Sequence, residues 1–197
     1  MPAMLLTEEV NFLYEALQPE NGPFKLRGLV QKANAKNQNG RVYTVEILNR
    51  ELKRLTDPIK NRRLVGQLDH PQTATIEYAK ASHLVTALTM EESGDMIGEL
   101  ELLDTPAGRI AKSLVESKVQ IGISSRGLGT VRKEEDILVV NDDFQLVTFD
   151  IVAEPSTPNA YPTRISEDLI RKITGHSKPA NIKKEMNKLI DSLIWKR

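Results

Sequence analysis

The sequence VQIGISSRG, residues 119–127, carries the alternation that decides the fold. Its isoleucines fall on one side of an extended chain, while Gly122 and Ser124 fall on the other, because side chains alternate along a strand. Two later runs, ILVV at 137–140 and FQLVTFDIVA at 144–153, are rich in β-branched and aromatic residues and follow turn-forming or charged segments. We therefore expect three consecutive strands, the last of the fold.

The preceding part of the chain continues this pattern of short strands. Further strands are expected at 24–34, 64–68, 76–90 and 96–103, and helices at about 7–17, 45–55 and 106–118. Many short strands with few helices argue against a doubly wound parallel sheet. The sequence thus predicts an α+β fold, a small and mostly antiparallel β-barrel flanked by helices.

A proline-containing stretch, PSTPN at 155–159, closes the strand pattern, and a helical tail is expected after it. We expect a first domain over residues 1–163, with an N-terminal helix at about 7–18, and a linker with an amphipathic helical tail over 164–197. The apolar residues of this tail recur at helical spacing: Ile182, Met186, Leu189, Ile190, Leu193 and Ile194. Such a stripe either packs on the barrel or docks on a partner.

The composition argues against several classes of protein. There are 27 basic and 27 acidic residues and 5% aromatic residues, which leaves few phosphate contacts or stacking platforms for nucleic acid. No stretch approaches the ~18 apolar residues that span a bilayer, and the start of the chain lacks the features of a signal peptide. With no cysteine and three separated histidines, we expect neither a metal nor another cofactor.

Serine, histidine and aspartate could together supply acyl-transfer chemistry. A serine hydroxyl becomes nucleophilic when an imidazole accepts its proton and a third group orients that imidazole. Ser124 leaves the apolar side of its strand, His70 would be the base, and Asp150 the third member. Two alternatives stay open at this point. Serine, histidine and aspartate are common enough to occur together by chance, and Asp150 could be an isolated strand carboxylate with a local hydrogen bond.

The residues around Ser124 suggest further roles. Arg126, with Ser125 and Gly127, is expected to hold a donor or an ordered water against an oxyanion or to contact substrate. The alternative is that Arg126 is simply solvated. His83 lies in a strand-like run, where packing or a surface hydrogen bond is the expected role. The glycines match neither a dinucleotide fingerprint nor a P-loop nor the G-x-S-x-G elbow.

Five segments together resemble the prohead core protein proteases of contractile-tailed phages. They are NGRVY at 39–43, GQLDHP at 66–71, LDTPAG at 103–108, GISSRGLG at 122–129 and DIVAEPS at 150–156. The resemblance covers about residues 24–163 and implies a barrel like that of herpesvirus assemblin. It also implies Ser124 as nucleophile, His70 as general base and Asp150 where assemblin has a second histidine.

The resemblance implies substrates and a location as well. Phage scaffold or core proteins and the major capsid protein would be cut inside the prohead, in the host cytoplasm, and the protease could self-associate. Proteases of this kind cut after glutamate with a hydrophobic residue two positions earlier. Self-cleavage is therefore expected after Glu167, with Glu8, near a start that we expect to be exposed, as the other candidate.

Two other functions compete with proteolysis. One is a catalytically silent scaffold or capsid-assembly protein that only binds, which the amphipathic tail would suit. The other is a barrel-type nucleic-acid-binding module, which the balanced charge and low aromatic content disfavour. Labelling of a serine by a fluorophosphonate would separate an enzyme from either binding protein.

Overall fold

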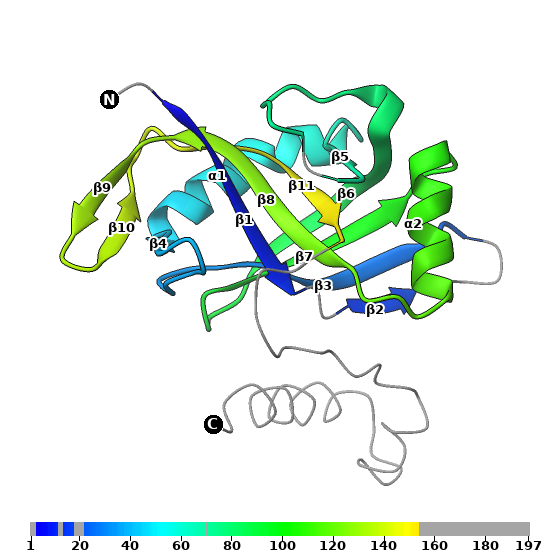
Figure 1. The fold of residues 1–197 in the computed structure, drawn as a ribbon, viewed down its shortest axis with the longest axis horizontal. Coiled ribbons are helices and arrows are strands. Elements are labelled where there is room, and N and C mark those ends of the chain that lie inside the picture. The colour runs from blue at the N-terminus through cyan, green and yellow to red at the C-terminus, as the bar shows by residue number, and fades with distance from the viewer. Residues whose placement is uncertain (1–2, 12–13, 18–21, 70, 154–197) are drawn as a thin grey trace, which may run out of the picture. The chain divides into compact units, whose positions relative to one another are not determined.

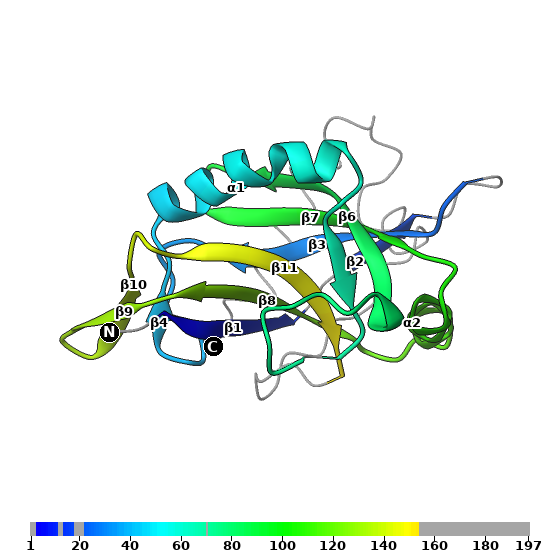
Figure 2. The same ribbon diagram turned by 90° about the horizontal axis from the view of Figure 1, so that it is seen from above.

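The computed structural model describes residues 3–11, 14–17, 22–69 and 71–153. These residues form three sheets (Figures 1 and 2). The first has the order β1-β8-β11, with β1 at Met4–Asn11, β8 at Gly122–Gly129 and β11 at Gln145–Val152. All its pairings are antiparallel.

The second sheet has five antiparallel strands in the order β2-β3-β7-β6-β5. Their bounds are Tyr14–Leu17, Lys25–Lys32, Asp95–Leu102, Ala81–Met90 and Val65–Gln67. The third sheet has the order β4-β10-β9, with bounds Arg41–Val42, Ile137–Val140 and Val131–Glu134. Only its β4–β10 pair is parallel, and β9 and β10 project from one end of the strands (Figure 2). The prediction of an α+β fold with mostly antiparallel strands is confirmed.

The described strands do not form the single closed barrel that the sequence predicted. The first and second sheets meet at β11 and β5, where Leu68 forms a parallel bridge with Ile151 and Thr148 Oγ1 donates to the Val65 carbonyl at 2.8 Å. In a closed barrel, another strand would pair with the outer edge of β1, but here side chains bind that edge. Asn39 Nδ2 and Arg41 Nη1 both donate to the Thr7 carbonyl there, so the edge is protected without closure.

The helix predicted near residues 7–18 is wrong, because β1 and β2 occupy most of that segment. Leu6 and Glu8 are both buried, which is the two-residue alternation of a strand rather than helical spacing. Strand β1 pairs along its whole length with β8. The helical spacing of apolar residues is a local pattern and could not reveal a partner strand more than a hundred residues away. The pairing with β8 overrides this local preference.

The other two helices are confirmed. Helix α1 spans Val45–Lys60 with Thr44 as N-cap, and α2 spans Pro106–Glu116 with Thr105 as N-cap. A short 3₁₀ turn, η1, occupies Tyr78–Lys80, where the sequence predicted a strand. None of the helices in the described ranges is long and apolar enough to cross a membrane.

The chain divides into the units Met1–Pro162 and Thr163–Arg197, and the second lies wholly outside the described residues. The predicted linker, helical tail and cleavage position at Glu167 therefore also fall outside the described residues. They remain predictions.

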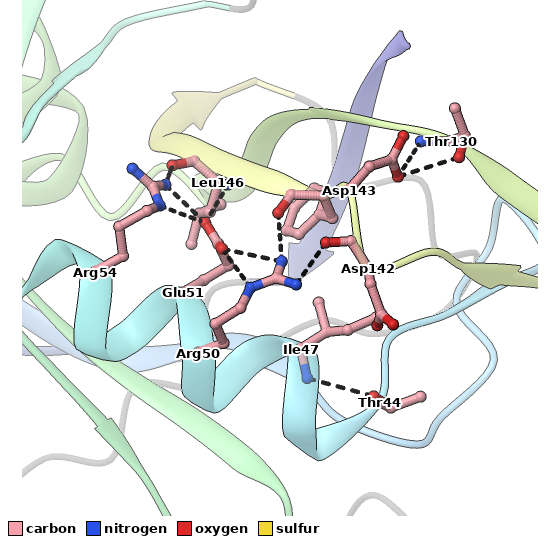
Figure 3. A network of polar contacts seen from close by, with 10 residues as sticks. Thr44, Ile47, Arg50, Glu51, Arg54, Thr130, Asp142, Asp143 and Leu146 are labelled. Carbon is pink, nitrogen blue, oxygen red and sulfur yellow. Dashed lines mark hydrogen bonds and ion pairs between the residues drawn. The ribbon is translucent and has the colours of Figure 1, made fainter. Parts of the chain in front are cut away.

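Helix α1 holds the beginning of β11 by side-chain bonds to its main chain (Figure 3). The buried carboxylate of Glu51 accepts from the Leu146 amide at 2.8 Å, and Arg54 donates to the Leu146 carbonyl. Arg50 reaches the carbonyls of Asp142 and Phe144. These bonds fix the strand just where its register against β8 shifts, between Leu146 and Thr148.

Candidate active site

Ser124 on β8 and Asp150 on β11 are direct partners across the antiparallel ladder. Directly opposed residues project to the same face of a sheet, and both side chains are fully buried. Ser125 projects to the other face, where Gln31 Nε2 lies 3.4 Å from its hydroxyl. The sheet thus brings Ser124, and not Ser125, to the side that carries Asp150.

Arg126 projects to the same face as Ser124 and is completely buried. Its Nη2 donates to Asp150 Oδ1 at 3.1 Å and to Gln67 Oε1 at 2.8 Å. Its Nη1 donates to the carbonyls of Thr73 at 2.7 Å and Thr75 at 3.1 Å. Nε lies 2.8 Å from Asp150 Oδ2, as an ion pair rather than an aligned hydrogen bond.

This arrangement corrects the expected oxyanion role of Arg126. The four hydrogens on the two Nη atoms meet four acceptors of the protein, and Nε is buried against Asp150. No donor of the guanidinium is left for a substrate oxygen. The alternative of a solvated loop arginine is also wrong, because the side chain is fully buried in β8.

Gly127 and Ser125 lie on the face of β8 away from Asp150, so neither has the expected place beside Ser124. A methyl group at Gly127 would collide with the ring of Phe144, which packs edge-on against Tyr43 with 5.1 Å between ring centroids. Gly127 is therefore explained by core packing. The expectation of substrate contact at Ser125 and Gly127 gains no support from this geometry.

The segment that leads to His70 is anchored on β11. The Asp69 amide donates to the Ile151 carbonyl at 2.8 Å, one residue beyond Asp150. Asp69 has a φ of 63°, in the left-handed region that aspartate tolerates better than most residues. His70 itself lies outside the described residues.

Gln67 is a buried residue that the sequence reasoning missed. Its amide N–H donates to Asp150 Oδ1 at 3.1 Å, its Nε2 donates to the Glu77 carbonyl at 3.0 Å, and its Oε1 accepts from Arg126. Gln67 therefore joins the aspartate, the arginine and the far end of the loop. Its place three residues before His70 in the GQLDHP segment was the signal that could have found it.

His83 is buried and structural. Its Nε2 lies 3.1 Å from the Phe149 carbonyl, which can only accept, so Nε2 carries the proton and Nδ1 accepts from Ser82 Oγ at 2.9 Å. A side chain at Gly66 would collide with this ring. Burial lowers the pKa of His83 to about 4, against smaller raising effects of Asp150 and the Phe149 carbonyl. Packing, one of the two expected roles, is confirmed.

Glu8, the second expected self-cleavage position, does not lie on an exposed segment. Its side chain is 2% exposed and its carboxylate accepts from Asn39 at 2.8 Å, Arg41 at 2.7 Å and the Tyr43 hydroxyl at 2.8 Å. Burial, and then the Glu8 charge, raise the pKa of Tyr43 far above its usual value. The NGRVY segment thus holds β1 in the sheet, and cleavage after Glu8 would require this strand to leave it.

Among the described residues, no group of three or more histidine, aspartate or glutamate side chains is arranged to hold a metal ion.

Comparisons with known proteins agree with this fold. A family model described as prohead core protein serine protease matches residues 16–169. Among solved structures, the capsid assembly protease gp21 of bacteriophage T4 matches with a TM-score of 0.70 at 22% identity. The match covers 77% of this chain and 99% of that one. A comparison with curated protein sequences gave no match.

Proposed function

Because this chain belongs to the prohead core protein serine proteases, we propose that it cuts peptide bonds with Ser124 as nucleophile, His70 as general base and Asp150 as the group that orients the base. The observation that carries this proposal is the cross-strand pairing of Ser124 with Asp150, beside the anchored amide of Asp69. Asp69, which precedes the proposed base in the sequence, is held by the bond from its amide to the Ile151 carbonyl, one residue beyond Asp150.

The proposed chemistry proceeds in two halves. His70 takes the proton of the Ser124 hydroxyl as the oxygen attacks the scissile carbonyl, and gives it to the leaving amine when the acyl-enzyme forms. Water then attacks the acyl-enzyme, with His70 again taking and returning a proton, and Ser124 is regenerated. Asp150 fixes the tautomer of the imidazole, and its charge is compensated by Arg126.

The substrates that we propose are phage scaffold or core proteins and the major capsid protein, cut after glutamate in a hydrophobic-x-Glu sequence. Proteolysis would take place inside the prohead, in the host cytoplasm, and we propose that the protease also self-associates. The related T4 protein is described as a capsid assembly protease, which supports this substrate class. Self-processing is proposed after Glu167, and no longer after Glu8, because β1 is held in the sheet.

The test is digestion of a purified scaffold protein, with new termini mapped by mass spectrometry. We expect cuts after hydrophobic-x-Glu sequences and a C-terminal fragment of the enzyme that begins at Asp168. Cuts elsewhere would contradict the glutamate preference, and an enzyme of unchanged mass after complete digestion would contradict self-processing. Binding of the scaffold without any cleavage would instead favour the catalytically silent assembly protein.

A further inference from the structure

We propose that Arg126 is a positioning residue that holds the loop of the general base against the strand of the nucleophile. This inference rests on the proposed roles of Ser124 and His70. Arg126 lies two residues after Ser124 on the same face of β8, while its guanidinium binds Gln67, Thr73 and Thr75. These three residues stand on both sides of His70 in the sequence.

The loop depends on these bonds because it has little else to hold it. Among the described residues from Asp69 to Glu77 none is buried, and Ile76 packs on the cluster of Val65, Ala81 and Leu84 only at the end of the loop. The middle of the loop therefore gains little from packing. Its described main-chain bonds lie at its ends, from Asp69 to Ile151 and from Lys80 to Glu77. Between these ends, the carbonyls of Thr73 and Thr75 both accept from the single nitrogen Nη1 of Arg126.

The opposite edge of the Arg126 guanidinium binds Asp150 on β11. Nε and Nη2 face the two oxygens of Asp150, and Nη2 also binds Gln67 Oε1. Gln67 in turn binds Asp150 through its main-chain amide and Glu77 through its side chain. The planar guanidinium of Arg126 therefore sets the distance between β11, which carries Asp150, and the loop residues that precede and follow His70 in the sequence.

A simple buried ion pair would not need this geometry. A lysine at this position could compensate the charge of Asp150, but a compact ammonium has three donors and no planar fork. It could not serve the carbonyls of Thr73 and Thr75 and the carboxylate together. The substitution Arg126→Lys thus separates charge compensation from positioning.

The experiment measures the rate at which a fluorophosphonate labels Ser124 in purified full-length protein, together with the melting temperature. Arg126→Lys should slow labelling by about tenfold or more while the protein stays folded, because general-base activation depends on geometry. Gln67→Ala keeps the Arg126–Asp150 pair and should also slow labelling. The matched control is Arg132→Lys, since Arg132 is an exposed arginine paired with Glu134, and its rate should not change.

A second measurement excludes a merely structural role. If Arg126 acts through His70, the effect of Arg126→Lys should nearly vanish in a His70→Ala background, because members of one unit are non-additive. The same factor in both backgrounds, or an unchanged rate in Arg126→Lys, would overturn the inference. If Arg126→Lys does not fold, Gln67→Ala alone and combined with His70→Ala decides by the same criteria. A wild-type protein that is not labelled at Ser124 would instead contradict the proposed function.

Discussion

Glu51 on α1 accepts a 2.8 Å hydrogen bond from the Leu146 amide, immediately before β11 shifts its register against β8. The shift matters because a change of one residue in register would turn Asp150 to the opposite face of the sheet. Arg54 binds the carbonyl of the same Leu146. Helix α1 therefore contributes to the site through the position of β11, although it provides none of its proposed reacting groups (Figure 3).

Glu51→Gln should lower both stability and activity. The amide replaces one acceptor by a donor that faces the Leu146 amide or the guanidinium groups of Arg50 and Arg54, at a cost of about 1–3 kcal/mol. Urea denaturation and peptide cleavage would measure the two effects. Glu46→Gln, at an exposed position of the same helix, is the control and should leave activity unchanged. Full activity in Glu51→Gln would show that α1 does not set the position of Asp150.

Asp150→Asn should cost more stability than a surface change, because it leaves the buried guanidinium of Arg126 uncompensated. Breaking a buried pair from one side costs about 3–5 kcal/mol. At a temperature where the variant is folded, cleavage should be slower than in the wild type but faster than in His70→Ala, because the base is misoriented and not removed.

A double variant separates the two roles of Asp150. Arg126→Met with Asp150→Leu removes both charges, and stability should recover in part because apolar groups can replace a buried ion pair. Activity should not recover. A double variant with wild-type cleavage would mean that neither side chain matters for catalysis.

His83 should make the protein less stable in mild acid. Its folded pKa is about 4, below the ordinary 6.5, because the ring is buried. Between these values the unfolded chain binds the proton and the folded chain does not, so stability falls as the pH drops from 6.5 towards 4. The full effect is about 3 kcal/mol, at 1.36 kcal/mol for each unit of pKa. NMR titration of the His83 ring should show no protonation above about pH 5, and a pKa near 6.5 would contradict the buried neutral ring.

Glu8→Gln should loosen β1. The carboxylate accepts from Asn39, Arg41 and Tyr43, and its loss leaves buried donors poorly paired, at a cost of about 1–3 kcal/mol. Limited proteolysis should then cut near the N-terminus faster than in the wild type. The control Glu134→Gln removes an exposed pair with Arg132 and should leave both stability and the cleavage rate unchanged. Equal protection of β1 in both variants would contradict the proposed anchoring role of Glu8.

The sequence predicted those features that depend on local patterns. Strand parity placed Ser124 and Ser125 on opposite faces, and the helices predicted at 45–55 and 106–118 correspond to α1 and α2. Helical spacing and strand alternation are properties of neighbouring residues. They can therefore be read without knowing which segments meet in space.

The features that the sequence missed depend on distant segments. Thr73 and Thr75, which bind Arg126, are more than fifty residues away from it along the chain. The periodicity of a sequence does not predict a contact between such distant residues. The spacing of apolar residues in the N-terminal segment predicts a helix, and its pairing with β8 is too remote in the sequence to correct that prediction. A glycine and arginine after a serine suggested an oxyanion site, whereas the fold uses Arg126 to hold a loop and Gly127 to admit Phe144.

A comparison of two adjacent serines tests the assignment of Ser124 as the nucleophile. Ser124 pairs with Asp150 on one face of β8, whereas Ser125 faces Gln31 on the other. Ser124→Ala should abolish both fluorophosphonate labelling and scaffold cleavage with the melting temperature retained, because no nucleophile remains. The matched change Ser125→Ala should keep substantial activity. Loss of labelling in Ser125→Ala with retention in Ser124→Ala would contradict the assignment of Ser124 as the nucleophile.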